Sequence, residues 1–230
     1  MLRLSNLHVD LSGFTLRADF EVGAGQRIAI IGPSGAGKST LLGAVAGFVP
    51  LKSGQILMDG RDVTGADPDK RGMAMLFQDG NLFPHLTLAQ NVGLGLRPGL
   101  RLSDIERANV DEAIARVGLQ GFGVRKPASL SGGQISRAAL ARVLLQARPL
   151  LLLDEPFAAL GPALRADMLD LVKDVVNETG AGLMMVTHSP EDARRIATDI
   201  VFVDEGAAHP PSPTAQTLDH PPPALRAYLG

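Results

Sequence analysis

A glycine-rich loop between an apolar run and a helical segment restricts what this chain can fold into more than any other feature. Residues 32–39 read GPSGAGKS, match the pattern G-x-x-x-x-G-K-[S/T], and directly follow the apolar run at 27–31. Residues 38–48 then carry apolar side chains at helical spacing. A buried strand, a glycine loop and a helix in this order predict the opening of a parallel α/β unit around a phosphate-binding loop.

The chemistry of this loop follows from its small residues and from the helix behind it. Backbone N–H groups can turn inward around phosphate oxygens, and the helix presents its positive N-terminal end to the same anion. We expect Lys38 to reach the β- and γ-phosphates and the Ser39 hydroxyl to ligate Mg²⁺. An ordinary glycine-rich turn is the alternative, which the flanking strand and helix disfavour. The expected nucleotide-binding residues here are Gly32, Pro33, Ser34, Gly35, Ala36, Gly37, Lys38, Ser39 and Thr40.

A second candidate element is the run of four leucines at 150–153, which ends in Asp154 and Glu155. A carboxylate at a strand end beside a phosphate loop can hold Mg²⁺. Because adjacent residues of a strand point to opposite sides, the two acids cannot share one role. We expect one to face the metal and the other to face the water that attacks the γ-phosphate. A plain charged turn is the alternative, and the phosphate loop argues against it.

The rest of the chain predicts the layout of the domain. Further buried strands are expected at 73–77, 183–186 and 200–203. Helical spacing at 88–94, 103–117 and 134–147 instead predicts a helical insertion over about 79–147, whose second helix starts with a capping box of Ser103 and Glu106. The first 25 residues and residues 54–60 alternate as in an antiparallel β lobe. Six of the 16 prolines lie in the last 21 residues, so we expect a loosely attached tail.

Composition removes several classes of function. The chain has 22 Lys and Arg against 24 Asp and Glu, a net charge of −2, which argues against nucleic-acid binding by a broad basic field. The absence of cysteine excludes disulfides, zinc–thiolate sites and cysteine nucleophiles. No stretch reaches about 18 apolar residues, and residues 1–10 lack a signal-peptide pattern. We therefore expect a soluble cytoplasmic protein that meets a membrane only through partners.

Residues 130–134, LSGGQ, lie 20 positions before the leucine run. Together with the phosphate loop, this segment makes the chain resemble the ATPase subunits of ABC transporters. The resemblance implies an α/β P-loop NTPase fold of the ABC ATPase type, with a parallel-sheet core, an antiparallel β lobe and a helical insertion. It divides the chain into an ABC ATPase domain at 1–206 and a Pro-rich C-terminal extension at 207–230.

The resemblance also implies roles for single residues. Gln78 matches the Q-loop glutamine, His188 matches the switch histidine, and Glu155 matches the base that polarises the attacking water. Ser39, Gln78 and Asp154 are the implied Mg²⁺ ligands. The turn before the helix at 134–147 would contact ATP held by a second subunit, so a head-to-tail homodimer would enclose two ATP molecules. The residues of that turn are Ser131, Gly132, Gly133 and Gln134.

Some positions depart from the family pattern. Gly161 stands where the family has the D-loop aspartate, which helps to couple the two nucleotide sites. Ile135 and Ser136 follow LSGGQ, where polar or basic residues are usual. The aromatic residue that stacks on adenine is absent around residues 9–11, which predicts weaker discrimination among nucleotide bases.

Residues 75–78, 81–87 and 91–96 look most like those of thiamine importer ATPases. The resemblance implies a subunit that hydrolyses ATP to energise import of thiamine or its phosphates. Its partners would be a second copy, membrane-spanning permease subunits and a periplasmic or extracellular solute-binding protein, at the cytoplasmic face of the inner membrane. Leu82, Phe83 and Leu86 are expected contacts of the permease. Alternatives are an importer of polyamines, sulfate or iron, a non-transport ABC ATPase, and a P-loop kinase, which would leave LSGGQ without a purpose.

Overall fold

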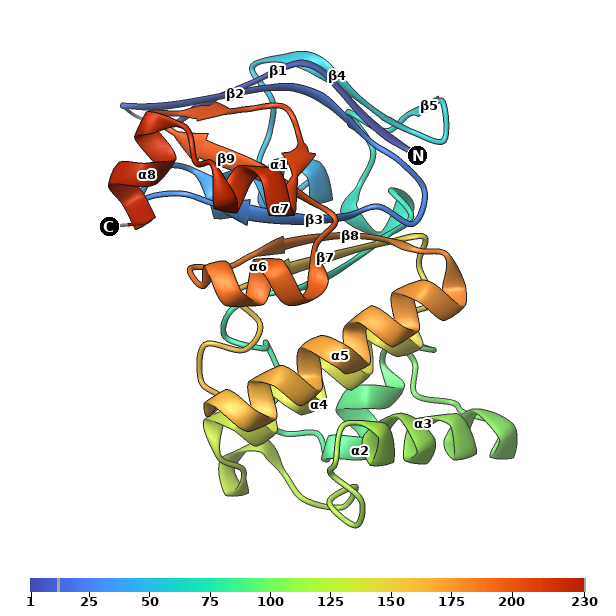
Figure 1. Cartoon of the computed structure of the whole chain (residues 1–230). Coiled ribbons are helices and arrows are strands. Elements are labelled where there is room, and N and C mark those ends of the chain that lie inside the picture. Colours follow the sequence, from blue (N-terminus) through green and yellow to red (C-terminus); the bar gives the residue numbers. More distant parts are fainter. Residues whose placement is uncertain (12, 230) are drawn as a thin grey trace.

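The computed structural model describes residues 1–11 and 13–229, and Figure 1 shows how their elements are arranged. Within these residues the strands form one sheet of eleven, in the order β5-β4-β1-β2-β10-β9-β3-β8-β7-β6, with β11 beside β9. No helix of the described part is both long and apolar enough to cross a bilayer.

The antiparallel lobe lies at the top of Figure 1 and confirms the predicted alternation. It contains β1 (Leu2–Leu11), β2 (Phe14–Val22), β4 (Ser53–Met58) and β5 (Arg61–Asp62), with β1 antiparallel to both β2 and β4. The alternate side chains of β2 that face the core are all buried, whereas their neighbours face solvent. Those buried side chains are Leu16, Ala18, Phe20 and Val22.

The predicted parallel core is confirmed as well. It contains β3 (Arg27–Ile31), β6 (Met73–Leu76), β7 (Leu150–Asp154), β8 (Gly182–Val186) and β9 (Asp199–Asp204). Every neighbouring pair in the order β9-β3-β8-β7-β6 is parallel. Strands β7 and β8 are buried along their whole length, as near-continuous apolar runs covered on both faces should be.

Helices cover the core and form the insertion below it in Figure 1. Helix α1 (Lys38–Ala46) follows the glycine loop, and α2 (Leu88–Gly93), α3 (Asp104–Arg116) and α4 (Gly132–Leu145) form the insertion. The 3₁₀ turns are η1 (Pro68–Lys70) and η2 (Pro127–Ser129). The predicted capping box at the start of α3 is present. Helix α4 begins two residues earlier than the apolar spacing predicts, because Ser131 and Gln134 form a second capping box.

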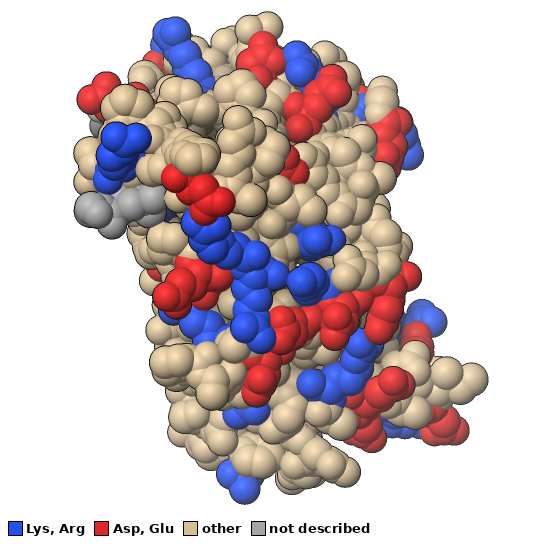
Figure 2. All heavy atoms as spheres, viewed as in Figure 1, with Lys and Arg blue, Asp and Glu red and all other residues tan. Residues whose placement is uncertain are grey.

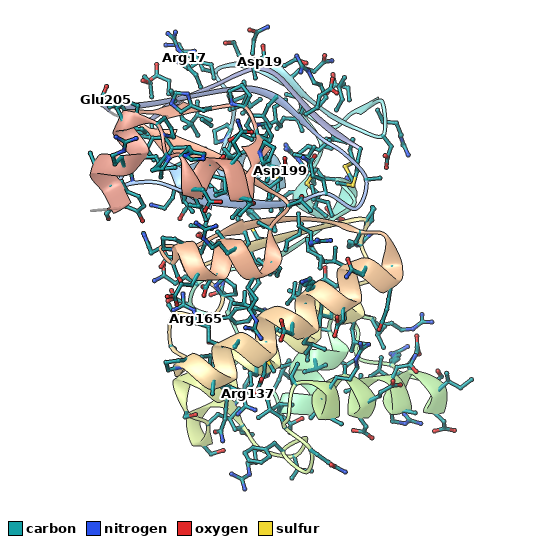
Figure 3. The ribbon with its side chains drawn as sticks, viewed as in Figure 1. Arg17, Asp19, Arg137, Arg165, Asp199 and Glu205 are labelled. Carbon is teal, nitrogen blue, oxygen red and sulfur yellow. The ribbon has the colours of Figure 1, made fainter. Side chains whose placement is uncertain are left out.

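The longest helix, α5 (Pro162–Thr179), was not anticipated from the sequence, and α6 (Pro190–Ile196) follows β8. Arg165 is labelled near the N-terminal end of α5 in Figure 3. It reaches across to α6, where Asp192 accepts from its Nε at 2.8 Å. This ion pair ties the two helices together next to the strand ends that carry the candidate site.

The C-terminal segment corrects the expectation of a loosely attached tail. It forms β10 (Ala207–Ala208), β11 (Ser212–Pro213), α7 (Thr214–Asp219) and α8 (Pro223–Leu229). Leu218 and Leu225 are buried in one cluster with Ile31 and Phe202 of the core sheet. The prolines do not prevent this, because Pro213 precedes α7 and Pro223 is the first residue of α8, where a missing N–H costs nothing.

Charged side chains of both signs are interspersed over the face shown in Figure 2. That face carries no broad basic area, which agrees with the near-balance of charges along the chain.

Candidate functional site

The strand register brings the candidate residues to one edge of the sheet. Val186 of β8 lies opposite both Ile30 of β3 and Asp154 of β7, and Leu76 of β6 lies opposite Leu153. The loops that follow these four strands therefore leave the sheet at the same carboxyl edge. Open α/β sheets bind ligands at this edge. Here it gathers the glycine loop, Gln78, the two acids and His188.

Close packing accounts for the glycines of the loop. A Cβ atom on Gly32 would lie 1.9 Å from the carbonyl oxygen of Val203, so no larger residue fits there. Gly37 has a φ of 106°, and its Cβ would lie 2.6 Å from Cζ of Phe14. Ser34 and Gly35, at the tip of the loop, remain exposed. The loop is thus fixed at its ends and open where an anion can approach.

Lys38 is held inside the loop by backbone carbonyl groups. Its Nζ donates to the carbonyl oxygens of Gly32 and Pro33, each at 2.8 Å, and the residue is only 6% exposed. Burial lowers the pKa of Lys38, while the nearby charges of Glu155 and Asp154 oppose that shift. An ammonium group that has only neutral carbonyl acceptors gains strongly from an arriving phosphate.

Ser39 and Asp154 join the loop to the acidic strand. The Ser39 hydroxyl donates to Oδ1 of Asp154 at 3.0 Å. Burial raises the pKa of Asp154, and the charge of Glu155 adds to that shift, while the hydrogen bond from Ser39 opposes it. A hydroxyl and a desolvated carboxylate side by side are hard oxygen donors suited to Mg²⁺, so this pair fits the expected cation.

Glu155 turns away from Asp154. Its φ of 46° lies in the left-handed region, which costs energy for a residue with a Cβ. The turn brings Oε1 of Glu155 within 2.5 Å of Nε2 of His188, while Asp154 faces Ser39. The two acids therefore have different partners, in keeping with the expectation that they play different roles.

The remaining predicted residues take no part in the hydrogen bonds described so far. Gln78 follows β6 and is exposed, and Thr40 lies half-buried in the first turn of α1. Ser131 caps α4 and is exposed together with Gly132, and the side chains of Ser131 and Gln134 bond within their own capping box. Next to them, a Cβ on Gly133 would lie 2.9 Å from Leu160, so this segment packs on the loop that follows Glu155.

Two contacts were missed by sequence reasoning, one at the C-terminal end of α1 and one at His188. Arg71 is 5% exposed and donates to the carbonyl oxygens of Ala44 and Val45, both at 3.0 Å, at the end of α1. Tyr228 of α8 lies 3.4 Å from Nδ1 of His188. Neither contact has a local sequence signal, although Tyr228 is the one tyrosine of the chain.

Comparison with known proteins adds relatives of the whole chain. The model of the family described as "ABC transporter" matches residues 16–158. A thiamine import ATP-binding protein, ThiQ, of Ruegeria sp. (strain TM1040) is 61% identical over 100% of both chains. The protein of the same name in Cereibacter sphaeroides is 60% identical, again over 100% of both chains. Among solved structures, the dimeric ATP-binding cassette MJ0796 bound to ADP and Pi has a TM-score of 0.84 at 28% identity, covering 93% of this chain and 99% of that one.

Proposed function

The chain belongs to the ABC transporter family, and from that premise we propose that it is the ATP-hydrolysing subunit of an importer of thiamine or its phosphates. The observation that carries the proposal is the 61% identity, over the full length of both chains, to a protein named for thiamine import and ATP binding. We also propose residues 1–206 as the ATPase domain and residues 207–230 as an extension, whose Leu218 and Leu225 pack on that domain.

The phosphate loop binds the triphosphate of ATP. Residues 32–40 supply backbone N–H groups and the N-terminal end of α1, and Lys38 exchanges two neutral carbonyl acceptors for the β- and γ-phosphates. Ser39, Asp154 and Gln78 would hold the Mg²⁺ that accompanies ATP, and the ion would neutralise phosphate charge. The hydrogen bond between Ser39 and Asp154 supports this cation site, because it places two of the three oxygen ligands side by side.

The residues that follow β7 and β8 catalyse the hydrolysis of ATP. Glu155 polarises the attacking water as a general base. His188 holds Glu155 at 2.5 Å through Nε2 and donates from the same nitrogen to the γ-phosphate when nucleotide is present. Gln78 orients the water, since its amide can both donate and accept. Loss of phosphate then removes an acceptor from His188.

A second copy of the chain completes the site. Ser131, Gly132, Gly133 and Gln134 form an exposed helix start suited to an anion, and in the dimer they contact the ATP held by the partner. Support for a dimer comes from the similar cassette MJ0796, whose solved structure with ADP and Pi is dimeric.

Membrane-spanning permease subunits are the further partners, and they hold the chain at the cytoplasmic face of the cell membrane. Phe48 and Phe83 are 54% and 48% exposed, so both rings present apolar surface to solvent. Phe48 packs edge-on against Phe77, next to Gln78, at 5.2 Å between ring centroids. The backbone N–H of Phe83 donates to Oδ1 of the buried Asn91 at 2.7 Å, which holds the loop that carries Phe83 in place. We place permease docking at these aromatic side chains, with Leu82 and Leu86 at the border of the docking surface.

A solute-binding protein is the last proposed partner, and it delivers the cargo to the permease on the opposite side of the membrane.

Uptake of labelled thiamine tests the proposal. A strain that lacks the gene should lose high-affinity uptake, the wild-type gene should restore it, and the Glu155→Gln variant should not. Glu112→Gln, an exposed change on α3, is the matched control and should restore uptake fully. Undiminished thiamine uptake in the deletion strain, with loss of uptake of a polyamine, sulfate or iron instead, would reassign the cargo.

A further inference from the structure

The C-terminal helix contacts the candidate catalytic pair. Oη of Tyr228 lies 3.4 Å from Nδ1 of His188, and Nε2 of the same ring lies 2.5 Å from Oε1 of Glu155. Tyr228 comes from α8, 40 positions after His188. The imidazole ring therefore has a partner on each nitrogen, one from the core sheet edge and one from the end of the chain.

The chemistry of the partners sets the direction of both hydrogen bonds. An ionised Glu155 carboxylate only accepts, so Nε2 of His188 must carry the proton that lies between them. In a neutral imidazole, Nδ1 then has a free lone pair and accepts, which makes the Tyr228 hydroxyl the donor. Glu155 thus selects the tautomer with its proton on Nε2, and the Tyr228 hydroxyl, by donating to Nδ1, stabilises the same tautomer.

Packing fixes α8 on the unit that carries His188. Leu225 is fully buried, at 0% exposure, in a cluster with Ala193 of α6 and Ile31 of β3, and Tyr228 packs against the same cluster. Helix α6 begins at Pro190, two residues after His188. The tyrosine and the helix that follows His188 therefore pack on one cluster, which holds α8 beside α6.

We propose that Tyr228 is a positioning residue for His188, which holds the imidazole ring in the Nε2-protonated tautomer required to donate toward Glu155 and the γ-phosphate. Tyr228 acts through the ring and touches no phosphate. The inference rests on the proposed ATPase role of His188 and deepens it. It also gives the C-terminal extension a part in the ATPase site.

The test compares the full-length wild type with Tyr228→Phe, which removes the hydroxyl and keeps the ring. Long-range proton–nitrogen NMR spectra of the nucleotide-free chain, recorded over a pH series that reaches the neutral ring, report which ring nitrogen is protonated. The chain has five histidines, and His188→Ala assigns the signal. The wild type should show the Nε2-protonated form, and Tyr228→Phe should shift the Nδ1 signal and mix the tautomers. An unchanged spectrum would overturn the proposal.

Kinetics provide the second readout. Loss of one hydrogen bond in Tyr228→Phe should lower kcat for ATP by about 2- to 10-fold with little change in KM. The same change in a His188→Ala background should have no further effect, because the ring that it positions is gone. Thr217→Val, which removes a hydroxyl of α7 that bonds Ser212 at 2.7 Å, is the matched control and should keep full kcat.

The outcomes separate this inference from the proposed function. Normal kcat in Tyr228→Phe, with an active wild type, would reject the positioning role and leave the ATPase assignment intact. A wild type that fails to hydrolyse ATP would reject the ATPase assignment, while the NMR comparison would still decide whether Tyr228 sets the tautomer. An equal loss of kcat in Thr217→Val would mean that the variants act through stability of the extension, which also overturns the proposal.

Discussion

The hydroxyl of Ser39 donates a hydrogen bond to Asp154 Oδ1 across 3.0 Å, although 115 positions of the chain separate the two residues. Strand β8 lies between β3 and β7 in the sheet, and its Val186 is opposite both Ile30 and Asp154. The sheet register therefore places the phosphate loop beside the acidic strand end.

Removal of the Lys38 ammonium should abolish most ATP affinity. In Lys38→Ala we expect the Kd for ATP to rise by about 10- to 100-fold, because a charge-assisted contact to phosphate is lost. Isothermal titration with ATP measures this change. Lys126→Ala, at an exposed lysine of the insertion, is the control and should bind normally. Normal affinity in Lys38→Ala would contradict the phosphate-loop assignment.

Neutralisation of Glu155 should separate binding from hydrolysis. We expect Glu155→Gln to keep ATP affinity and to lose about 100-fold or more in kcat, since the general base is gone. With ATP present, the variant should also accumulate as a dimer in light scattering. Glu112→Gln should behave as wild type in both measurements. Unchanged turnover in Glu155→Gln would exclude this residue as the base.

Arg71 should matter for stability through α1, the helix behind the phosphate loop. Its guanidinium also donates to the carbonyl oxygens of Thr64 and Ala66, at 2.7 and 2.9 Å. Arg71→Ala leaves these buried acceptors unpaired and should lower the free energy of unfolding by about 2–4 kcal/mol in urea titrations. Arg17→Ala, an exposed change on β2 (Figure 3), should cost little. Equal stabilities would contradict the role of Arg71.

The hydroxyl of Tyr228 should lose its proton at a higher pH in the folded protein than in the unfolded chain. Burial raises its pKa above the ordinary value of about 10, and the charge of Glu155 adds to the shift. Folding therefore favours the neutral phenol, and this contribution to stability is present below the unfolded pKa and lost as pH rises through the folded pKa. As the chain has one tyrosine, tyrosinate absorbance reports this group alone. The midpoint should fall to about 10 in urea, and equal midpoints would contradict the burial.

Gly161, the departure from the family's D-loop aspartate, should accept that aspartate without strain. It is the N-cap of α5 with a φ of −67°, and its Cβ would meet nothing within 4 Å. Gly161→Asp should raise the free energy of unfolding by about 0.3–1 kcal/mol, because aspartate caps the helix and restricts the unfolded chain. Thermal melting measures this gain. Gly32→Asp is the contrasting variant and should unfold the protein, because a side chain at Gly32 would collide with the backbone of Val203. A loss of stability in Gly161→Asp would contradict the open space around Gly161.

Local patterns made much of the fold predictable. Apolar runs located β3, β7 and β8, and the spacing of Ser103 and Glu106 located the start of α3, because a buried strand and a capped helix start depend on adjacent residues. The prediction of a loosely attached tail, which came from the number of prolines there, was wrong, because proline is well tolerated at helix starts such as those of α7 and α8. Helix α5 was missed, although its Gly161-Pro162 start is a common helix opening.

The sequence by itself determined the phosphate loop, the acidic strand end and the family, because each is written in a short run of residues whose chemistry depends on their neighbours in the chain. Only the tertiary structure decided that Asp154 faces Ser39 while Glu155 contacts His188. It also decided that Arg71 donates to the carbonyl groups at the end of α1 and that Tyr228 of α8 contacts His188. These contacts join residues many positions apart, and their partners are chosen by strand register and core packing, which no local pattern encodes.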